Sequence, residues 1–227
     1  MIQPTVYIFN NELNIGDEEI AIIASHLPAE RLEKADRYLR AVDRNNCMIS
    51  YFLLLYGLLE NYGIKAIPET AVGTHGKPYF TNTDISFSIS HCDSGVCCGI
   101  SDCSIGVDIQ DTDIEFEEIL DIAMSQREKE VIARSDAPAE AVARFWSLKE
   151  CICKYRGTGI DDSLNKLDFS EADGDIFSFD GAVFRSENRE HFCISACTEN
   201  QAPVFIERDL EQYIHSFLKM NNKKYLY

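Results

Sequence analysis

The sequence is short of positive charge. It has 21 Lys and Arg residues against 38 Asp and Glu residues, which gives a formal net charge of -17 at pH 7. Proteins that bind nucleic acids usually present a basic surface, so this balance argues against that class. If the ligands are anions, local clusters of Lys and Arg must offset the acidic field of the whole molecule.

The sequence also lacks segments typical of membrane or exported proteins. Its longest apolar run, residues 51–59, is interrupted by Gly57 and is too short to span a bilayer. The first ten residues, MIQPTVYIFN, have neither a basic start nor a long apolar stretch, so we expect no signal peptide. These absences predict a cytoplasmic protein with no membrane partner.

Two common binding motifs are missing as well. The nine cysteines form no pair of Cys-x-x-Cys knuckles, and those between 92 and 103 lie in strand-like runs. This favours reduced, buried thiols over a metal cluster. No G-x-x-x-x-G-K-[ST] loop is present, although a nucleotide hydrolase would be expected to have one.

The hydrophobic pattern predicts strands and helices in separate blocks. We expect a strand at 5–10, helices at 20–27, 29–40 and 43–62, a loop at 73–80 and strands between 84 and 110. Helices follow at 116–123, 125–134 and 138–155, then strands between 164 and 208 and a final helix at 208–219. This order predicts an α+β fold of two similar halves, residues 1–104 and 105–227, rather than alternating βα units.

Two strand segments contain polar residues of the types that bind ligands or take part in catalysis. Phe87–His91 ends in Ser-His at a sheet edge. A lone histidine at such a position more often has a structural role, with its hydrogen bonds made within the protein, than a role in binding a ligand. In Gly106–Gln110, Asp108 and Gln110 are two residues apart and therefore point to the same face of a strand. A carboxylate between apolar neighbours is costly to bury unless it is paired or bound to a metal.

A third segment lies on the helix predicted at 138–155. Five of its side chains share one face at spacings of three and four, namely Trp146, Lys149, Glu150, Cys153 and Lys154. Glu150 and Lys154 alone would be consistent with an exposed ion pair. The only tryptophan of the chain lies on the same face, however, and a fully solvated face would not usually contain it.

Together these segments predict a site for a polyphosphate. A carboxylate from a strand and one from a helix can hold a hard cation such as Mg²⁺. Lys154 lies one turn from Glu150 and is placed to contact a bound phosphate. The helix predicted at 29–40 adds bases on one side, Arg31, Lys34, Arg37 and Arg40, although such a stripe taken alone is more often a solvated surface.

Four motifs occur in an order and spacing that resemble a known family. They are HGKPYF at 75–80, FSISH at 87–91, GVDIQ at 106–110 and FWSLKECICKYRGTG at 145–159. Over residues 28–160 the sequence is similar to the surfactin-synthetase type of 4′-phosphopantetheinyl transferase. The resemblance implies a monomer of two similar α+β halves with coenzyme A (CoA) bound between them. It also implies a holo-[acyl-carrier-protein] synthase activity: Mg²⁺-dependent transfer of 4′-phosphopantetheine from CoA to a serine of an acyl or peptidyl carrier protein, with release of 3′,5′-ADP.

The resemblance assigns roles to individual positions. Asp108 and Glu150 match the family's metal-binding carboxylates, and Glu150 is also the best candidate for the general base. The positions that match CoA-contacting residues are Ser90 and His91 near the 3′-phosphate, Gly76, Lys77 and Pro78 beside the adenine nucleotide, and Arg31, Lys34 and Lys154 at the phosphates. Lys149 matches a signature position without an assigned role. Carrier proteins are typically acidic, so we expect a local docking surface that is either basic or apolar, with the Lys and Arg residues between 127 and 156 as candidates.

One position departs from the family pattern, G-[IV]-D-[IVL]-E, because Gln110 replaces the second acidic residue. An amide oxygen can still coordinate Mg²⁺, but without a negative charge. Gln110, a water molecule, or Asp111 or Asp113 from the adjacent loop are therefore alternative third ligands. The same departure is the only support for a different class of function, a non-catalytic protein that binds CoA or a carrier protein.

Overall fold

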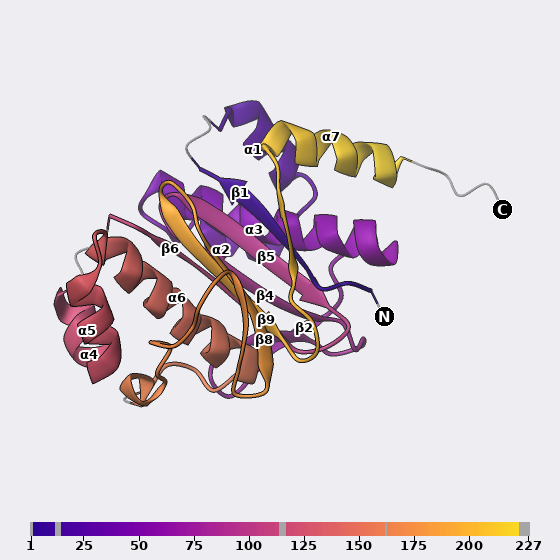
Figure 1. Cartoon of the computed structure of the whole chain (residues 1–227). Coiled ribbons are helices and arrows are strands. Elements are labelled where there is room, and N and C mark those ends of the chain that lie inside the picture. Colours follow the sequence, from indigo (N-terminus) through magenta and orange to yellow (C-terminus); the bar gives the residue numbers. More distant parts are fainter. Residues whose placement is uncertain (1, 12–14, 114–116, 162, 223–227) are drawn as a thin grey trace.

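The computed structural model describes residues 2–11, 15–113, 117–161 and 163–222. They form two four-stranded sheets, and a long helix covers the outer face of each (Figure 1). The mixed α+β class predicted from the sequence is therefore confirmed. No helix of these residues is long and apolar enough to cross a membrane.

The first sheet has the strand order β10-β1-β5-β4. Its strands are β1 (Thr5–Asn10), β4 (Ser86–His91), β5 (Gly95–Ser101) and β10 (Val204–Glu207). Helices α1 (Asp17–Ala24), α3 (Ala41–Tyr62) and α7 (Leu210–Asn221) cover one face, and α2 (Ala29–Ala35) packs beside α3. The apolar helix α3 ends at Gly63, whose φ of 68° provides the left-handed residue that commonly caps a helix.

The second sheet is antiparallel and has the order β6-β9-β8-β7. Its strands are β6 (Ile105–Asp111), β7 (Ile176–Phe179), β8 (Ala182–Asn188) and β9 (Phe192–Thr198). Helix α6 (Pro138–Arg156) lies on its outer face. Helices α4 (Glu117–Ala123) and α5 (Gln126–Arg134) and a short 3₁₀ turn at Leu164–Lys166 pack on α6 or next to it.

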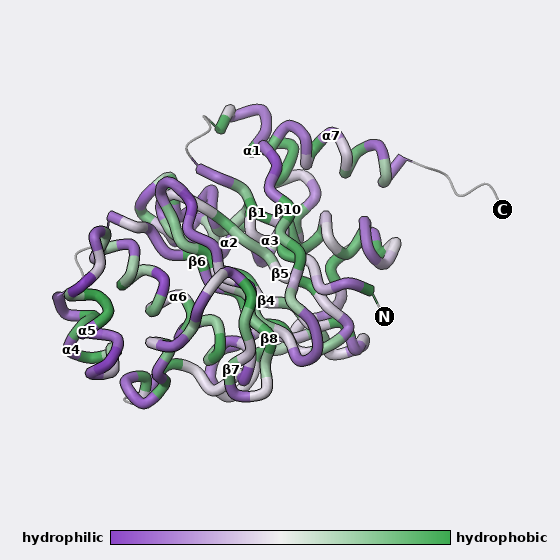
Figure 2. The backbone as a smooth tube through the Cα atoms, viewed as in Figure 1, coloured by the Kyte–Doolittle hydropathy of each residue, from purple (hydrophilic) through white to green (hydrophobic). Residues whose placement is uncertain are grey.

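Hydrophobic residues between the two sheets form a shared core. Val6 and Ile8 of β1 pack there with Val107 and Ile109 of β6 and with residues of β9, all of them fully buried. Hydrophobic residues are accordingly concentrated on the central strands in Figure 2. Strands β4 and β6, each at the edge of its sheet, lie next to each other, so polar residues of both strands can meet.

Two local predictions need correction. The helix predicted at 29–40 ends at Ala35, and α3 begins at Ala41, so Arg37 and Arg40 do not continue the helical face of Arg31. Arg44 explains this break, because its guanidinium donates to the carbonyl oxygens of Tyr38 and Leu39 and so stabilises a non-helical turn. The loop predicted at 73–80 is instead a hairpin of β2 (Thr70–Val72) and β3 (Pro78–Phe80) around a short turn.

The other predicted elements are confirmed within a few residues, except that residue 116, predicted to start a helix, lies outside the described residues. The division at residue 104 stays a prediction, and the end of the chain crosses it. Strand β10 pairs parallel to β1, and the Tyr213 and Phe217 side chains of α7 are buried in the core beside α3. Residues 204–221 thus belong spatially with the first sheet.

This placement of α7 predicts a stability effect. Phe217 is 1% exposed, and its ring lies 5.2 Å from that of Phe52 in α3. Phe217→Ala should lower the free energy of unfolding by about 3–5 kcal/mol, because it leaves a cavity in the core. Urea unfolding followed by circular dichroism measures this, with Lys219→Ala on the exposed face of α7 as control. A loss below about 1 kcal/mol for Phe217→Ala would show that α7 is not part of this core.

Candidate active site

Gly106 allows α6 to pack unusually closely on β6. A Cβ atom at this position would lie 2.1 Å from the carbonyl oxygen of Cys151 and 2.6 Å from the backbone nitrogen of Tyr155. No larger residue fits without moving the helix. Because side chains alternate along a strand, Asp108 points to the same face of β6 as Gly106 and therefore toward α6.

Asp108 is a fully buried carboxylate whose two oxygens are both engaged. Its Oδ1 accepts hydrogen bonds from the Ser90 hydroxyl at 2.7 Å and the Lys154 ammonium at 2.5 Å. Its Oδ2 accepts from the side-chain amide of Gln110 at 2.9 Å. The structure thus brings together one residue of β4, two of β6 and one of α6, as the sequence predicted for a common site.

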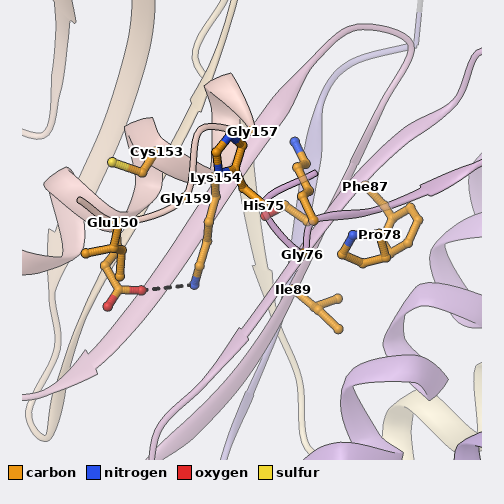
Figure 3. Close-up of a pocket in the computed structure, with 13 residues that line it drawn as sticks. His75, Gly76, Pro78, Phe87, Ile89, Glu150, Cys153, Lys154, Gly157 and Gly159 are labelled. Carbon is orange, nitrogen blue, oxygen red and sulfur yellow. Dashed lines mark ion pairs between the residues drawn. The ribbon is translucent and has the colours of Figure 1, made fainter. Parts of the chain in front are cut away.

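Lys154 links this carboxylate to a second one. Its ammonium also lies 2.8 Å from the Ser90 hydroxyl and 3.4 Å from Glu150 Oε2, the pair marked by the dashed line in Figure 3. Burial opposes the charge of Lys154, but Asp108 and Glu150 outweigh burial and raise the pKa of the ammonium. Burial and the negative charge of Asp108 raise the pKa of Glu150 to about 7. A carboxyl group with this pKa can accept or release a proton near neutral pH.

A cavity of about 350 Å³ opens beside these charges. One wall consists of His75, Gly76, Lys77 and Pro78 together with Phe87 and Ile89 of β4; the other consists of α6 and the loop that follows it (Figure 3). The lining is largely apolar, with Glu150 and Lys154 on one side. A polar group at the edge of an apolar cleft is the usual arrangement of a small-molecule site.

The predicted loop at 76–78 therefore does border a cavity shared with Glu150 and Lys154. Within it, the Lys77 ammonium donates to the carbonyl oxygen of Ile105 at 3.0 Å, and burial lowers its pKa. This bond fixes the loop against the start of β6. Lys77 thereby joins the hairpin of β2 and β3 to the second sheet.

His91, at the end of β4, lies in a positively charged environment. Partial burial and the charges of Lys154, Arg31 and Lys34 lower the pKa of its imidazole, while Asp43 opposes them. The cations predicted to contact phosphate thus gather near this end of the site. Arg31 is itself held by α3: it is 8% exposed, stacks over the Tyr51 ring at 3.6 Å and donates to the Cys47 carbonyl oxygen.

The common face predicted for α6 is partly wrong. Glu150, Cys153 and Lys154 line the cavity, but Lys149 is completely buried on another side, where its ammonium lies 2.8 Å from Glu128 Oε2. Trp146 is half-buried in the core of the second half and does not line the cavity. A helix spaces consecutive residues by about 100°, so Lys149 and Glu150 point in different directions. Sequence reasoning missed Glu128, although Ser125 and Glu128 form a recognisable capping box.

The donor set fits a hard divalent cation. Asp108 and Glu150 supply carboxylate oxygens on either side of Lys154, and Mg²⁺ is usually bound by one or two carboxylates plus phosphates and water. Gln110 is a hydrogen-bond donor to Asp108 in this arrangement. Asp111 accepts from the backbone nitrogens of Asp93 and Ser94 instead. Among the described residues, no group of three or more His, Cys, Asp or Glu side chains gathers for a metal.

The mixed α+β fold places paired carboxylates, a lysine and further cations beside one cavity. Comparison with known proteins then gives the family. The sequence model of the 4′-phosphopantetheinyl transferase superfamily matches residues 104–217, half of the chain, and the protein belongs to this superfamily. The family predicted from the four motifs is confirmed.

Two relatives are similar over part of the chain. The 4′-phosphopantetheinyl transferase gsp of Aneurinibacillus migulanus is 29% identical over 156 residues, which cover 64% of this chain and 62% of the relative. The L-aminoadipate-semialdehyde dehydrogenase-phosphopantetheinyl transferase of Candida glabrata is 28% identical over 139 residues, or 56% of this chain and 54% of the relative. The similarity thus spans less than two thirds of either relative.

The close packing at Gly106 can be tested directly. Gly106→Ala should destabilise the protein by about 1–3 kcal/mol and increase the separation of Asp108 and Lys154, since the new methyl group overlaps the α6 backbone. Thermal unfolding gives the first effect, and a crystal structure of the variant gives the second. Gly73→Ala is a suitable control, because its Cβ would meet only an ordinary contact at 3.4 Å. Unchanged stability of Gly106→Ala would contradict the packing described here.

Proposed function

We propose that the protein transfers the 4′-phosphopantetheine group of CoA to a serine of an acyl or peptidyl carrier protein and releases 3′,5′-ADP. Family membership supports this reaction class. The observation that carries it is the buried Asp108, which contacts Lys154 at 2.5 Å beside Glu150 at the side of the cavity. The finer expectations belong to the same proposal: two similar halves with CoA between them, acting as a monomer in the cytoplasm.

In this proposal, the nucleotide part of CoA occupies the cavity beside residues 75–78. The Lys154 ammonium contacts the diphosphate, and Arg31 and Lys34 provide positive potential for the 3′-phosphate. The His91 imidazole, whose pKa is lowered by burial and by these cations, donates a hydrogen bond to the same phosphate. Asp108 and Glu150 would hold Mg²⁺, which would supply positive charge to neutralise the diphosphate. Gln110 supports Asp108 through its amide and leaves the site one negative charge poorer than an Asp-x-Glu pattern.

The chemistry requires one proton transfer and one displacement. The carrier serine oxygen forms a bond to the β-phosphorus of CoA, and the phosphorus–oxygen bond to the leaving 3′,5′-ADP breaks. Glu150 accepts the serine proton, and in the metal-free protein burial and Asp108 raise the pKa of its carboxyl group. Lys154 stabilises the charge that develops on the leaving group.

Carrier docking through bases between 127 and 156 remains part of the proposal. In the free protein, Arg127 pairs with Glu171, Lys129 with Asp121, and Arg156 with Asp180. Ion pairs between exposed residues contribute little stability, so an acidic partner can replace the internal carboxylates at small cost. The net charge of -17 makes long-range attraction of such a partner unfavourable.

The reaction is tested by intact-mass analysis of a panel of apo carrier proteins incubated with CoA, Mg²⁺ and this protein. We expect a mass gain of one phosphopantetheine on a serine. Asp108→Asn and Glu150→Gln should each reduce transfer by at least about 100-fold, because each removes a charge from the reacting site, whereas Glu140→Gln, at an exposed position of α6, should be fully active. Binding of CoA with no transfer to any carrier would favour the non-catalytic alternative that Gln110 raised.

His91 should determine the preference for the 3′-phosphate. His91→Ala removes a group that lies among the cations of this end of the site. The wild type should favour CoA over dephospho-CoA, and the variant should lose most of that preference, about a tenfold change in the ratio of kcat/KM values. Steady-state kinetics with both substrates measures the ratio. If it is the same in variant and wild type, His91 has no contact with the 3′-phosphate.

A further inference from the structure

A completely buried ion pair lies outside the candidate site. Lys149 of α6 and Glu128 of α5 are both 0% exposed, and their charged groups are 2.8 Å apart. Burying two charges is costly, and apolar side chains of similar volume often stabilise a core equally well. General stability therefore does not explain why charged residues occupy these two positions.

The contacts of the pair show what it holds. Glu128 accepts from the backbone nitrogen of Ser125 at 2.7 Å and from that of Phe169 at 2.9 Å. The Lys149 ammonium donates to the carbonyl oxygens of Leu164, at 2.9 Å, and Leu167. With Glu128 as its third partner, all three donors of Lys149 are used. The pair thus fastens residues 164–169 to both α5 and α6.

The fastened segment follows the cavity wall a few residues later in the sequence. Gly157, Gly159 and Ile160 follow directly after α6 and line the cavity opposite the loop at 75–78. Gly159 has a φ of 72°, and a Cβ atom there would lie 3.1 Å from the Cβ of His75, so the two loops are in close contact. The chain then returns to the core through Leu164 and Phe169, which are 2% and 1% exposed.

Lys149 and Glu150, although adjacent on α6, therefore contact different parts of the protein. Glu150 faces the cavity, while Lys149 bonds to the segment that follows the cavity wall along the chain. Lys149 has no free donor to offer a ligand, so it cannot act on a bound phosphate in this arrangement. Its effect on a ligand must pass through the position of the backbone at 157–160.

We propose that Lys149 and Glu128 are a positioning pair that holds the 157–160 wall against the 75–78 loop and thereby sets the affinity for the nucleotide part of CoA. This inference rests on the proposed function for the identity of the ligand. It assigns Lys149 a role in binding CoA rather than in the chemical step. The carrier protein contacts none of these groups in the proposal, so its KM should not depend on the pair.

The test combines calorimetric titration of CoA with hydrogen exchange of backbone amides. Lys149→Met should raise the Kd and KM for CoA about tenfold, leave the KM for the carrier protein unchanged and accelerate exchange at residues 157–161 and 163–169. Glu128→Gln should have the same effects, and the double variant should be no worse than about the poorer single variant, since both changes break one interaction. Glu130→Gln, on the same helix as Glu128 but at the surface, is the matched control.

Two outcomes would overturn the inference. One is a wild-type Kd for CoA in Lys149→Met although exchange at 163–169 is faster, because the wall would then not govern affinity. The other is a raised Kd with unchanged exchange, because Lys149 would then act by another route. If Lys149→Met does not fold, Glu128→Gln carries the same test with almost no change in shape. Failure of the proposed function is distinguishable, because it is measured on the wild type. If the wild type does not bind CoA, the inference falls with the proposed function; if it binds CoA without transfer, the Kd and the exchange rates still test the inference.

Discussion

The compensation of one buried charge organises the centre of this molecule. Asp108 has no exposed surface, so its carboxylate must find partners within the protein. Lys154 comes from α6, Ser90 from the edge of the first sheet and Gln110 from the same strand. These partners meet only if α6 lies close to β6 and β4 lies next to β6. Gly106 meets the first requirement, and the shared core between the sheets meets the second.

The same constraint gives the site its chemical character. Lys154 neutralises Asp108 but also stands near Glu150, so two carboxylates share one ammonium in a largely buried setting. Burial and the negative charge of Asp108 raise the pKa of Glu150 toward neutrality, and Lys154 only partly offsets them. The cavity beside it is mainly apolar and is bordered by backbone from the 75–78 loop. Charge for phosphate and surface for a larger organic group therefore occur side by side.

Much of the fold and site could be predicted from local patterns. Alternation along Gly106–Gln110 placed Asp108 and Gln110 on one face of a strand, and the spacing of Glu150 and Lys154 placed them on one face of a helix. Contacts between residues far apart in the sequence could not be predicted from such local patterns. Lys149 was grouped with Glu150 by approximate helical spacing, yet its orientation depends on Glu128 and on two distant carbonyl groups. Likewise, the pairing of β10 with β1 joins residues some 200 positions apart, and no local signal encodes that register.

The central claim is that Asp108 and Lys154 depend on each other for their burial. The most direct measurement is a double-mutant cycle in the free energy of unfolding, with Asp108→Asn, Lys154→Met and the double variant. We expect each single variant to lose about 3 kcal/mol or more, because each leaves a buried charge without its partner. The double variant should be more stable than the sum of the single losses by at least about 1.5 kcal/mol. Additive losses would contradict this account, because they would mean that the two charges do not stabilise each other.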